Sequence, residues 1–395
     1  MRLGLLAVLL SLVPGASPAF TALSDLNGEP VWTTKSDKFG EIRVRTLYLE
    51  APDHLLALIQ KPTSRPRWAF AGGTQASVRE LLVRAGLPAE MLARMMDPAR
   101  HVMQDGAFVI FPEIDDLLAL APAMRAVVYP ELAKSPLNEF HRDPVFIVGE
   151  TLDDWLRQSH LGERQKAALR RMVWKRGDTL VFSDLRTLLA LAETPQEVQE
   201  VFRTMSRTRA LIVDLSLPEK ADSAALIDYW SAGFPDADTL PFLKGALQRD
   251  SVTSIDVSRL LPAMARRRLY TYPTLDQAIG GRFPDCHWTS LNFFNNSPIG
   301  YYLDTRLASG ALLANYEPVD GPRRFGDVLV YVTGDSVIHS CVFVADDIVY
   351  TKNGENILAP WVLQRLSDVS AIYRATPDVQ VRAFRLRSSE RLRQR

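Results

Sequence analysis

One short segment of the sequence places a thiol, an imidazole and an indole side by side. Its residues, FPDCHWTSLNF, occupy positions 283–293. Cys286 is one of only two cysteines in the chain, and Cys341 is the other. Cys286 can be a small buried hydrophobe, half of a disulfide with Cys341, or a nucleophile. We predict that it is a nucleophile, because the residues around it favour a reactive thiolate.

The residues before Cys286 predict a helix start. Pro284 biases the preceding residue toward an extended conformation, and Asp285 is a good N-cap. Cys286 would then lie in the first turn, where unpaired backbone N–H groups favour a negatively charged sulfur. The same N–H groups can hold the oxyanion that forms during acyl transfer.

A nucleophilic thiol also needs a base within reach of the sulfur. His287 follows Cys286 directly, but successive residues of a helix diverge by about 100° and do not face each other. His339 is the better candidate, because it begins a predicted strand after the segment GDVLVY at 326–331. We therefore predict His339 as the base.

The imidazole of such a base needs a third group that fixes its tautomer. The returning strand offers Thr351, Lys352 and Asn353. A two-residue turn at 346–347 would place Lys352 on the face of His339, and a turn one residue longer would present Thr351 or Asn353 instead. We predict Asn353, because its amide carbonyl can accept the imidazole N–H.

In their order along the chain these segments resemble the NlpC/P60 family of papain-like cysteine peptidases and amidases. The family patterns D-C-S-G, G-D-L-V-F-F and H-V-G-I-Y correspond here to 285–288, 326–331 and 339–343. The Cys-x-Trp sequence is also similar to the CHAP amidases. The resemblance covers about a quarter of the chain and implies a papain-like fold with Cys286 as nucleophile and His339 as base. It also implies cleavage of peptide or amide bonds in bacterial peptidoglycan, most often next to D-amino acids.

The sequence departs from the family pattern at three places. His287 and Trp288 replace the small residues after the nucleophile, and with Asp285 they are the predicted substrate contacts. Cys341 replaces a glycine two residues after the base, on the predicted strand face of His339. Counting from the base, the family's third polar residue falls near Thr351.

The first residues predict a secretion signal. An apolar run at 3–13 follows Met1-Arg2 and ends at Pro14-Gly15, and it is too short for a membrane-spanning helix. Small residues follow, so we expect cleavage after Ala19, with Ala16 as the alternative site. The mature protein would be secreted or periplasmic; an uncleaved N-terminal helix is the other interpretation.

The middle of the chain predicts a repeat. The segments GAFVIFPEIDDLLALA at 106–121 and GDTLVFSDLRTLLALA at 177–192 align without gaps, each predicting a strand, an acidic turn and a helix. A third similarity pairs RAVVYP at 125–130 with RLYTYP at 268–273. The period is roughly 70–75 residues, which is typical of stacked units.

These patterns predict an α+β protein in four parts. They are a signal peptide at 1–19, a β-containing segment at 20–75, repeated α/β units at 76–273 and a papain-like catalytic domain at 274–385. Within the second part, alternating apolar residues at 41–49 predict a strand, and near the end of the fourth, two apolar runs around Asp346-Asp347 predict a hairpin.

Composition limits the function classes. Forty-six basic residues balance forty-six acidic ones, so nothing indicates nucleic-acid binding. We expect no metal, no organic cofactor and no membrane span. The prediction is a secreted cysteine hydrolase acting on peptide or amide bonds in peptidoglycan, whose repeats bind a protein partner or its target. The alternatives are an exported scaffold with a degenerate peptidase domain, and an acyltransferase that uses the same Cys286 and His339.

Overall fold

The chain is a mixed α and β protein built on antiparallel sheets, in agreement with the predicted α+β class. Four such sheets lie in the part of the chain that the structure describes. The predicted signal peptide at 1–19 lies outside it. The computed structural model describes residues 32–59, 65–157, 159–217, 223–234, 237–374 and 378–391.

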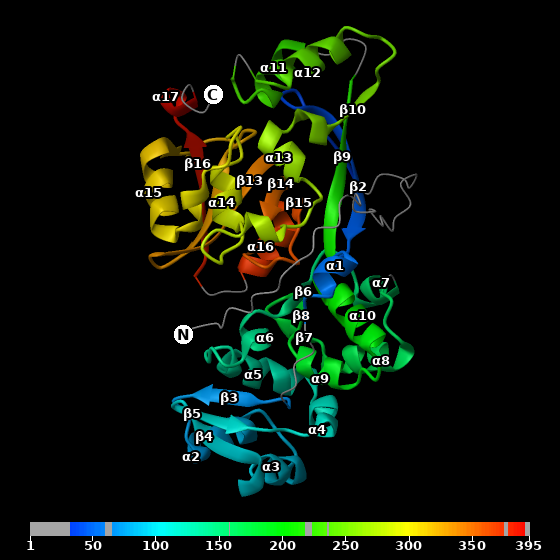
Figure 1. The fold of residues 1–395 in the computed structure, drawn as a ribbon, viewed down its shortest axis with the longest axis vertical. Coiled ribbons are helices and arrows are strands. Elements are labelled where there is room, and N and C mark those ends of the chain that lie inside the picture. Colours follow the sequence, from blue (N-terminus) through cyan, green and yellow to red (C-terminus); the bar gives the residue numbers. More distant parts are fainter. Residues whose placement is uncertain are drawn as a thin grey trace.

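A long antiparallel strand pair runs along the right-hand side of the upper half of the molecule (Figure 1). The predicted strand at 41–49 is β2, and it pairs with β9 from Glu41↔Ser216 to Leu49↔Thr208. The segment at 20–75 is therefore not separate from the predicted repeats, because its main strand completes a sheet with them. The strands of this sheet are β1 (Trp32–Ser36), β2 (Gly40–Leu49), β9 (Thr208–Ser216) and β10 (Ser254–Asp256).

Two successive units share one element order. In each, a strand is followed by two helices, a β-hairpin and a third helix, and the hairpin's second strand lies in the middle of the sheet. The first unit contains β3 (Trp68–Ala71), α2 (Gln75–Arg84), α3 (Ala89–Met95), β4 (His101–Gln104), β5 (Ala107–Ile110) and α4 (Ile114–Ala119). The second contains β6 (Val145–Ile147), α7 (Leu152–Arg157), α8 (Glu163–Met172), β7 (Trp174–Arg176), β8 (Thr179–Phe182) and α9 (Leu185–Ala190).

The two aligned sequence segments occupy equivalent places in these units. The segment at 106–121 forms β5 and α4, and the segment at 177–192 forms β8 and α9. Gly106 and Gly177 begin the aligned segments in the hairpin turns, where both have positive φ, 74° and 61°. The first unit begins with β3, so its start lies before the boundary predicted at residue 76.

The third predicted copy has a different structure. After β9 come α11 (Ser223–Trp230), α12 (Leu240–Leu247) and β10, without the hairpin of the other units. The motif at 125–130 lies inside α5 (Pro122–Leu132). The motif at 268–273 begins at the last residue of α13 (Ala263–Arg268) and continues beyond the helix. The predicted equivalence of these motifs is wrong, because Tyr270 has a φ of 60° and donates its N–H to Trp361 O at 2.7 Å.

The two units are joined by a buried ion pair. Arg125 on α5 is fully buried and donates to Asp184 Oδ2 at 3.1 Å, while Tyr129 donates its hydroxyl to the same carboxylate at 2.7 Å. Asp184 precedes α9, and its carboxylate makes no cap hydrogen bond there. The remaining helices of this region are α1 (Asp53–Leu56), η1 (Pro98–Arg100), α6 (Glu139–Arg142), α10 (Pro195–Ser206) and η2 (Val257–Leu260).

The C-terminal region forms a six-stranded antiparallel sheet of order β11-β16-β12-β13-β14-β15. The predicted hairpin around Asp346-Asp347 is the β13–β14 turn. The strands are β11 (Tyr316–Pro318), β12 (Val328–Thr333), β13 (Ser336–Ala345), β14 (Ile348–Lys352), β15 (Trp361–Arg365) and β16 (Gln380–Leu386). The helices are η3 (Leu275–Gln277), α14 (Cys286–Leu291), η4 (Gly300–Leu303), α15 (Thr305–Asn315), α16 (Leu366–Tyr373) and α17 (Ser388–Arg391).

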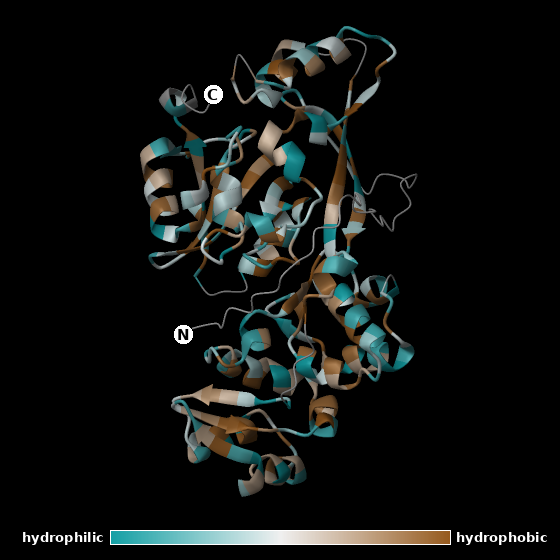
Figure 2. Cartoon of the chain, in the orientation of Figure 1, coloured by the Kyte–Doolittle hydropathy of each residue, from teal (hydrophilic) through white to brown (hydrophobic). Residues whose placement is uncertain are grey.

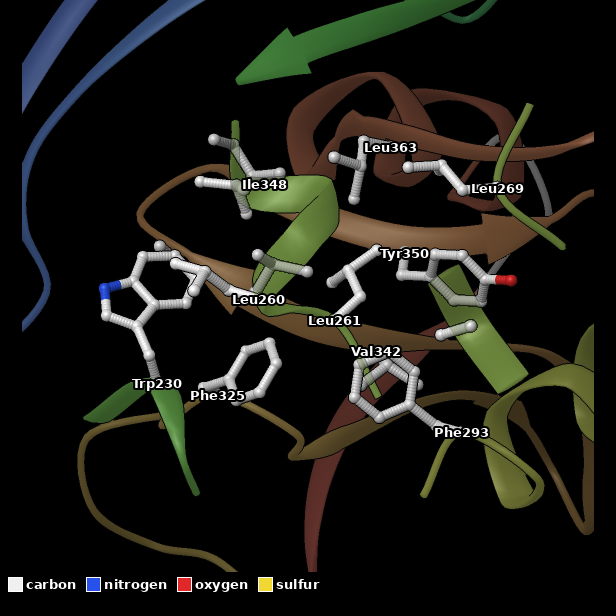
Figure 3. Packing of buried hydrophobic residues seen from close by; sticks show 14 of the residues in the cluster. Trp230, Leu260, Leu261, Leu269, Phe293, Phe325, Val342, Ile348, Tyr350 and Leu363 are labelled. Carbon is white, nitrogen blue, oxygen red and sulfur yellow. The ribbon is translucent and has the colours of Figure 1, made fainter. Parts of the chain in front are cut away.

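The two faces of this sheet have different cores. Val342 and Tyr350 face the core that contains α14 and α15, whereas Cys341 and Val349 pack against Val369 of α16. The first core is continuous with residues outside the predicted catalytic domain: Figure 3 shows Trp230, Leu260 and Leu261 packed beside the sheet residues Val342, Ile348, Tyr350 and Leu363. Hydrophobic residues gather on the strands throughout the chain (Figure 2).

None of the helices in the described residues has the length and apolarity needed to cross a lipid bilayer.

Gly326 allows a close approach between the start of β12 and the segment after α14. Its φ is +90°, and its N–H donates to Phe343 O at 2.9 Å. A Cβ at this position would lie 2.2 Å from Cζ of Phe294. The next residue, Asp327, is buried and receives two hydrogen bonds from Arg385, at 2.8 and 2.7 Å. Glycine is therefore required here both by the backbone conformation and by the ring.

We predict that Gly326→Ala lowers the free energy of unfolding by about 3 kcal/mol, because it combines backbone strain with a steric clash. Chemical denaturation measures the change. Gly334→Ala is the matched control: Gly334 has a φ of +53° with open space around its Cβ position, so it should lose only about 1 kcal/mol. Equal losses in the two variants would contradict the role of Phe294.

Candidate active site

Helix α14 begins as the sequence predicts. Asp285 is its N-cap residue, and its Oδ1 accepts the N–H of Trp288 at 2.8 Å. Cys286 is the first residue of the helix and is buried, with 5% of its surface exposed. The thiol therefore lies in the first turn, where backbone N–H groups have no partner within the helix.

Ser340 on β13 fixes this helix start to the sheet. Its hydroxyl donates to the backbone carbonyl of Cys286 at 3.2 Å. His287 Nδ1 lies 3.0 Å from the hydroxyl oxygen of Ser340. Because the hydroxyl proton is used on the carbonyl, His287 Nδ1 must carry the proton of the second bond. Burial lowers the pKa of His287, and the nearby carboxylate of Asp285 opposes this only in part. The imidazole of His287 is therefore turned toward β13 as a structural donor.

His339 also lies on β13 and is completely buried. Its Nε2 is 3.2 Å from Thr351 Oγ1, and its Nδ1 has no hydrogen-bond partner. Tyr373 of α16 stacks on the ring, with the centroids 3.9 Å apart and the planes within 9°. One ring nitrogen is thus held, the ring plane is fixed, and the other nitrogen is free to accept a proton.

A β-bulge decides which residue contacts this imidazole. The β13–β14 turn has two residues, the shorter of the two lengths considered, but the strand register shifts between Phe343 and Ala345. The shift reverses the alternation of β14, so Thr351 rather than Lys352 shares the face of His339. Asn353, the predicted third residue, donates to Gln364 Oε1 at 2.9 Å instead. The structure thus corrects the assignment: the partner of the imidazole is Thr351.

Cys286 and His339 have electrostatic neighbours in common, but no hydrogen bond joins the two side chains among the described residues. Negative charge on Cys286 interacts with Lys352, Cys341 and Tyr373. Of these, Tyr373 stacks on His339 and Cys341 lies two residues along the same strand face. The imidazole lies on the α16 face of the sheet and α14 packs on the other face, so the structure does not bring the sulfur and the imidazole into hydrogen-bonding contact.

The two cysteines are free thiols rather than a disulfide. Cys341 is completely buried in the apolar cluster beneath α16, and this burial raises the pKa of its thiol well above the ordinary value. It is therefore an inert residue of the core.

The three predicted substrate contacts have different surroundings. Trp288 is 4% exposed and packs in the core beside Trp361, at a centroid distance of 6.4 Å, which does not fit a contact with substrate. Asp285 is buried and serves as the helix cap. His287 lines a small pocket between α14, α15 and β12–β13.

Lys352 is a buried cation whose role the sequence did not indicate. It lies on the α14 face of β14, is completely buried, and donates its Nζ–H groups to Gly354 O at 2.8 Å and Asn356 O at 2.9 Å. Burial lowers its pKa to about 8, although negative charge on Cys286, Asp285 and Glu355 opposes the change. The bulge in β13 that moves Thr351 toward His339 also moves Lys352 toward Cys286.

No protein-family model, curated protein or solved structure matches the chain. The described residues also contain no cluster of three or more His, Cys, Asp or Glu side chains that could hold a metal ion.

The titration of Lys352 predicts a specific pH dependence of stability. Its folded pKa of about 8 lies below its ordinary value of 10.5, so between these pH values the unfolded chain binds a proton that the folded chain has released. The free energy of unfolding should therefore rise with pH in this window, by up to about 3 kcal/mol for this residue.

The measurement is the difference in unfolding free energy between wild type and Lys352→Met at several pH values from 7 to about 11. Taking the difference removes the titration of the buried tyrosines, which both proteins share. A difference that stays constant across the window would show that Lys352 titrates normally in the folded protein.

Proposed function

We propose that the protein is a cysteine hydrolase that cleaves peptide or amide bonds in bacterial cell-wall peptidoglycan, with Cys286 as nucleophile and His339 as base. The observation that carries the proposal is the state of His339: Nε2 is held by Thr351 and Nδ1 is buried without a partner. A buried imidazole nitrogen without a hydrogen-bond partner lowers the stability of a protein core. A general base needs such a nitrogen, because it must have a free lone pair to accept a proton.

The chemistry follows from this tautomer. In the proposed reaction neutral His339 donates Nε2–H to Thr351, and it accepts the thiol proton of Cys286 at Nδ1 once substrate binding has brought the sulfur to that nitrogen. The thiolate attacks the carbonyl carbon, and the negative charge that develops on oxygen faces the N–H groups at the start of α14. The C–N bond then breaks, the leaving amine takes the proton from the imidazolium, and a thioester remains on Cys286. Water, deprotonated by His339, releases the acid and restores the thiol.

The substrate class comes from the resemblance to the NlpC/P60 family. The order of helix-start Cys286, strand β12 and His339 on β13 agrees with that family's pattern. Thr351 follows His339 by twelve residues, near the place where the family has its third polar residue. The proposed export, based on residues 1–19, would bring the enzyme to the cell wall.

The direct test is digestion of purified peptidoglycan, with mass spectrometry of the released fragments. We expect wild type to release peptide fragments, Cys286→Ala to release none, and His339→Gln to be slower by about 10²–10⁴-fold. Cys341→Ala is the matched control, because it removes the other buried thiol and should keep the activity. Activity that survives Cys286→Ala would contradict the assignment, and so would the absence of fragments from wild type across walls with different peptide stems.

Thr351 gives a separate prediction. Thr351→Val keeps the shape of the side chain but removes the hydroxyl that holds His339, so we expect kcat to fall about tenfold, as for the loss of one hydrogen bond. Thr351→Ser restores the hydroxyl and should recover most of the rate. Equal rates for the valine and serine variants would show that Thr351 only packs against the ring.

A second candidate function is an exported binding protein with an inactive peptidase-like domain. The observation that favours it is burial: Cys286 is 5% exposed and His339 is 0% exposed. In this case a neutral alkylating reagent should label Cys286 no faster than a free thiol in solution. Faster labelling that depends on His339 favours the hydrolase, or an acyltransferase that resolves the same thioester with an acceptor other than water.

A further inference from the structure

Lys352 is a completely buried cation without a carboxylate partner. Its Nζ donates to two backbone carbonyls, and among the described residues no acidic side chain forms an ion pair with it. A lysine ammonium has three donors, so one N–H remains for another acceptor. A buried charge is costly unless a charge of opposite sign compensates it.

The alternation of β14 places this cation on the α14 face of the sheet. Tyr350, two residues before Lys352, packs in the core that contains α14, and Lys352 itself pairs with Trp361 of β15. Ser340, on the same face of β13 as Val342, donates to the backbone carbonyl of Cys286. Lys352 therefore lies on the same face of the sheet as the residue that binds the backbone of Cys286.

A contact with Trp361 of β15 also holds Lys352 near α14. Lys352 Nζ lies 5.8 Å from the ring centroid of Trp361 on β15. Trp361 donates its Nε1–H to Thr289 Oγ1 of α14 at 2.9 Å. The lysine therefore sits between two strands that are each hydrogen-bonded to the helix that begins with Cys286.

The other charged groups around Lys352 have partners of their own. Asp285 caps α14, and Glu355 pairs with Arg282 at 3.2 Å. Arg268 lies over the ring of Trp361 at 5.3 Å and adds positive charge. The imidazoles of His287 and His339 bond Ser340 and Thr351. The remaining group near Lys352 that can gain a negative charge is the sulfur of Cys286, with which it interacts electrostatically.

We propose that Lys352 is the cation that stabilises negative charge on the sulfur of Cys286. This inference rests on the proposed function, because it assigns Lys352 to the nucleophile of that reaction. Lys352 acts as an electrostatic positioning residue and transfers no proton: two of its three hydrogens are donated to carbonyls, and the thiol proton goes to His339.

The charge of an alkylating reagent tests this directly. In alkylation the thiolate forms a C–S bond and iodide leaves, and iodoacetate carries a negative charge that iodoacetamide lacks. A cation beside the sulfur should favour iodoacetate. We expect the ratio of the two rate constants, measured at pH 7 in a Cys341→Ala background, to fall about tenfold in Lys352→Met, an effect typical of one nearby charge. Lys352→Arg, which keeps the charge, should retain more of the ratio than the methionine variant.

The experiment remains decisive if these variants do not fold, which circular dichroism will show. In the Cys341→Ala protein, which retains Lys352, the same ratio should fall as the pH rises through about 8, where Lys352 loses its proton. His339→Gln should keep this dependence, because it removes only the imidazole. A ratio that does not change in folded Lys352→Met, or across this pH range, overturns the inference.

The outcomes separate this inference from the proposed function. A ratio that depends on Lys352 in a protein that cleaves no peptidoglycan supports the electrostatic role and contradicts the hydrolase. Peptidoglycan cleavage with a ratio independent of Lys352 supports the hydrolase and contradicts the role of Lys352.

Discussion

The arrangement of the candidate site depends on the β-bulge between Phe343 and Ala345. In an antiparallel pair, one extra residue in one strand reverses the faces of all the residues beyond it. Here the reversal places Thr351 against His339 and Lys352 on the side of Cys286. Without the bulge the two residues would exchange faces, so a buried ammonium would meet the imidazole and a threonine would lie near the thiol. One irregularity in the backbone thus separates Thr351, the partner of the proposed base, from Lys352, the cation near the proposed nucleophile.

The position of the nucleophile depends on how α14 meets the sheet. Asp285 caps the first turn, Ser340 binds the carbonyl of Cys286, and Trp361 bonds Thr289 one turn later. A helix of six residues has little stability of its own, so these contacts and the core beneath it determine where Cys286 lies. That core extends through Trp230 to the strands β2 and β9. These strands and the segments that contain Trp230, Leu260 and Leu261 therefore do more than carry the C-terminal sheet, since residues before 274 complete the core on which the site rests.

The sequence predicted those parts of the site that depend on local chemistry. The helix start, the N-cap Asp285, the strand that carries His339 and the hairpin turn at 346–347 follow from the properties of Pro, Asp and β-branched residues. The orienting residue could not be predicted in this way, because the position and length of the turn alone do not show the register shift between Phe343 and Ala345. Lys352 was considered only as a partner of His339, and its burial beside Cys286 follows from the same shift.

In the rest of the chain, too, the sequence predicted local elements but not the pairing of distant segments. The aligned segments at 106–121 and 177–192 have the same strand and helix, because their apolar residues and hairpin glycines match position by position. The motifs at 125–130 and 268–273 are similar in sequence but not in structure. The first lies in helix α5, and the second is hydrogen-bonded to β15 through Tyr270 and Trp361. The pairing of β2 with β9 joins residues far apart in sequence, and no local pattern could indicate it.

The central claim is that His339 keeps its proton on Nε2 and offers Nδ1 to Cys286. Nitrogen-15 NMR of the imidazole, in wild type and in Cys286→Ala, measures this directly. The account predicts a protonated Nε2 at neutral pH in both proteins, and an Nδ1 resonance that moves when the thiol is removed. A proton on Nδ1, or an Nδ1 resonance unaffected by the loss of Cys286, would contradict it.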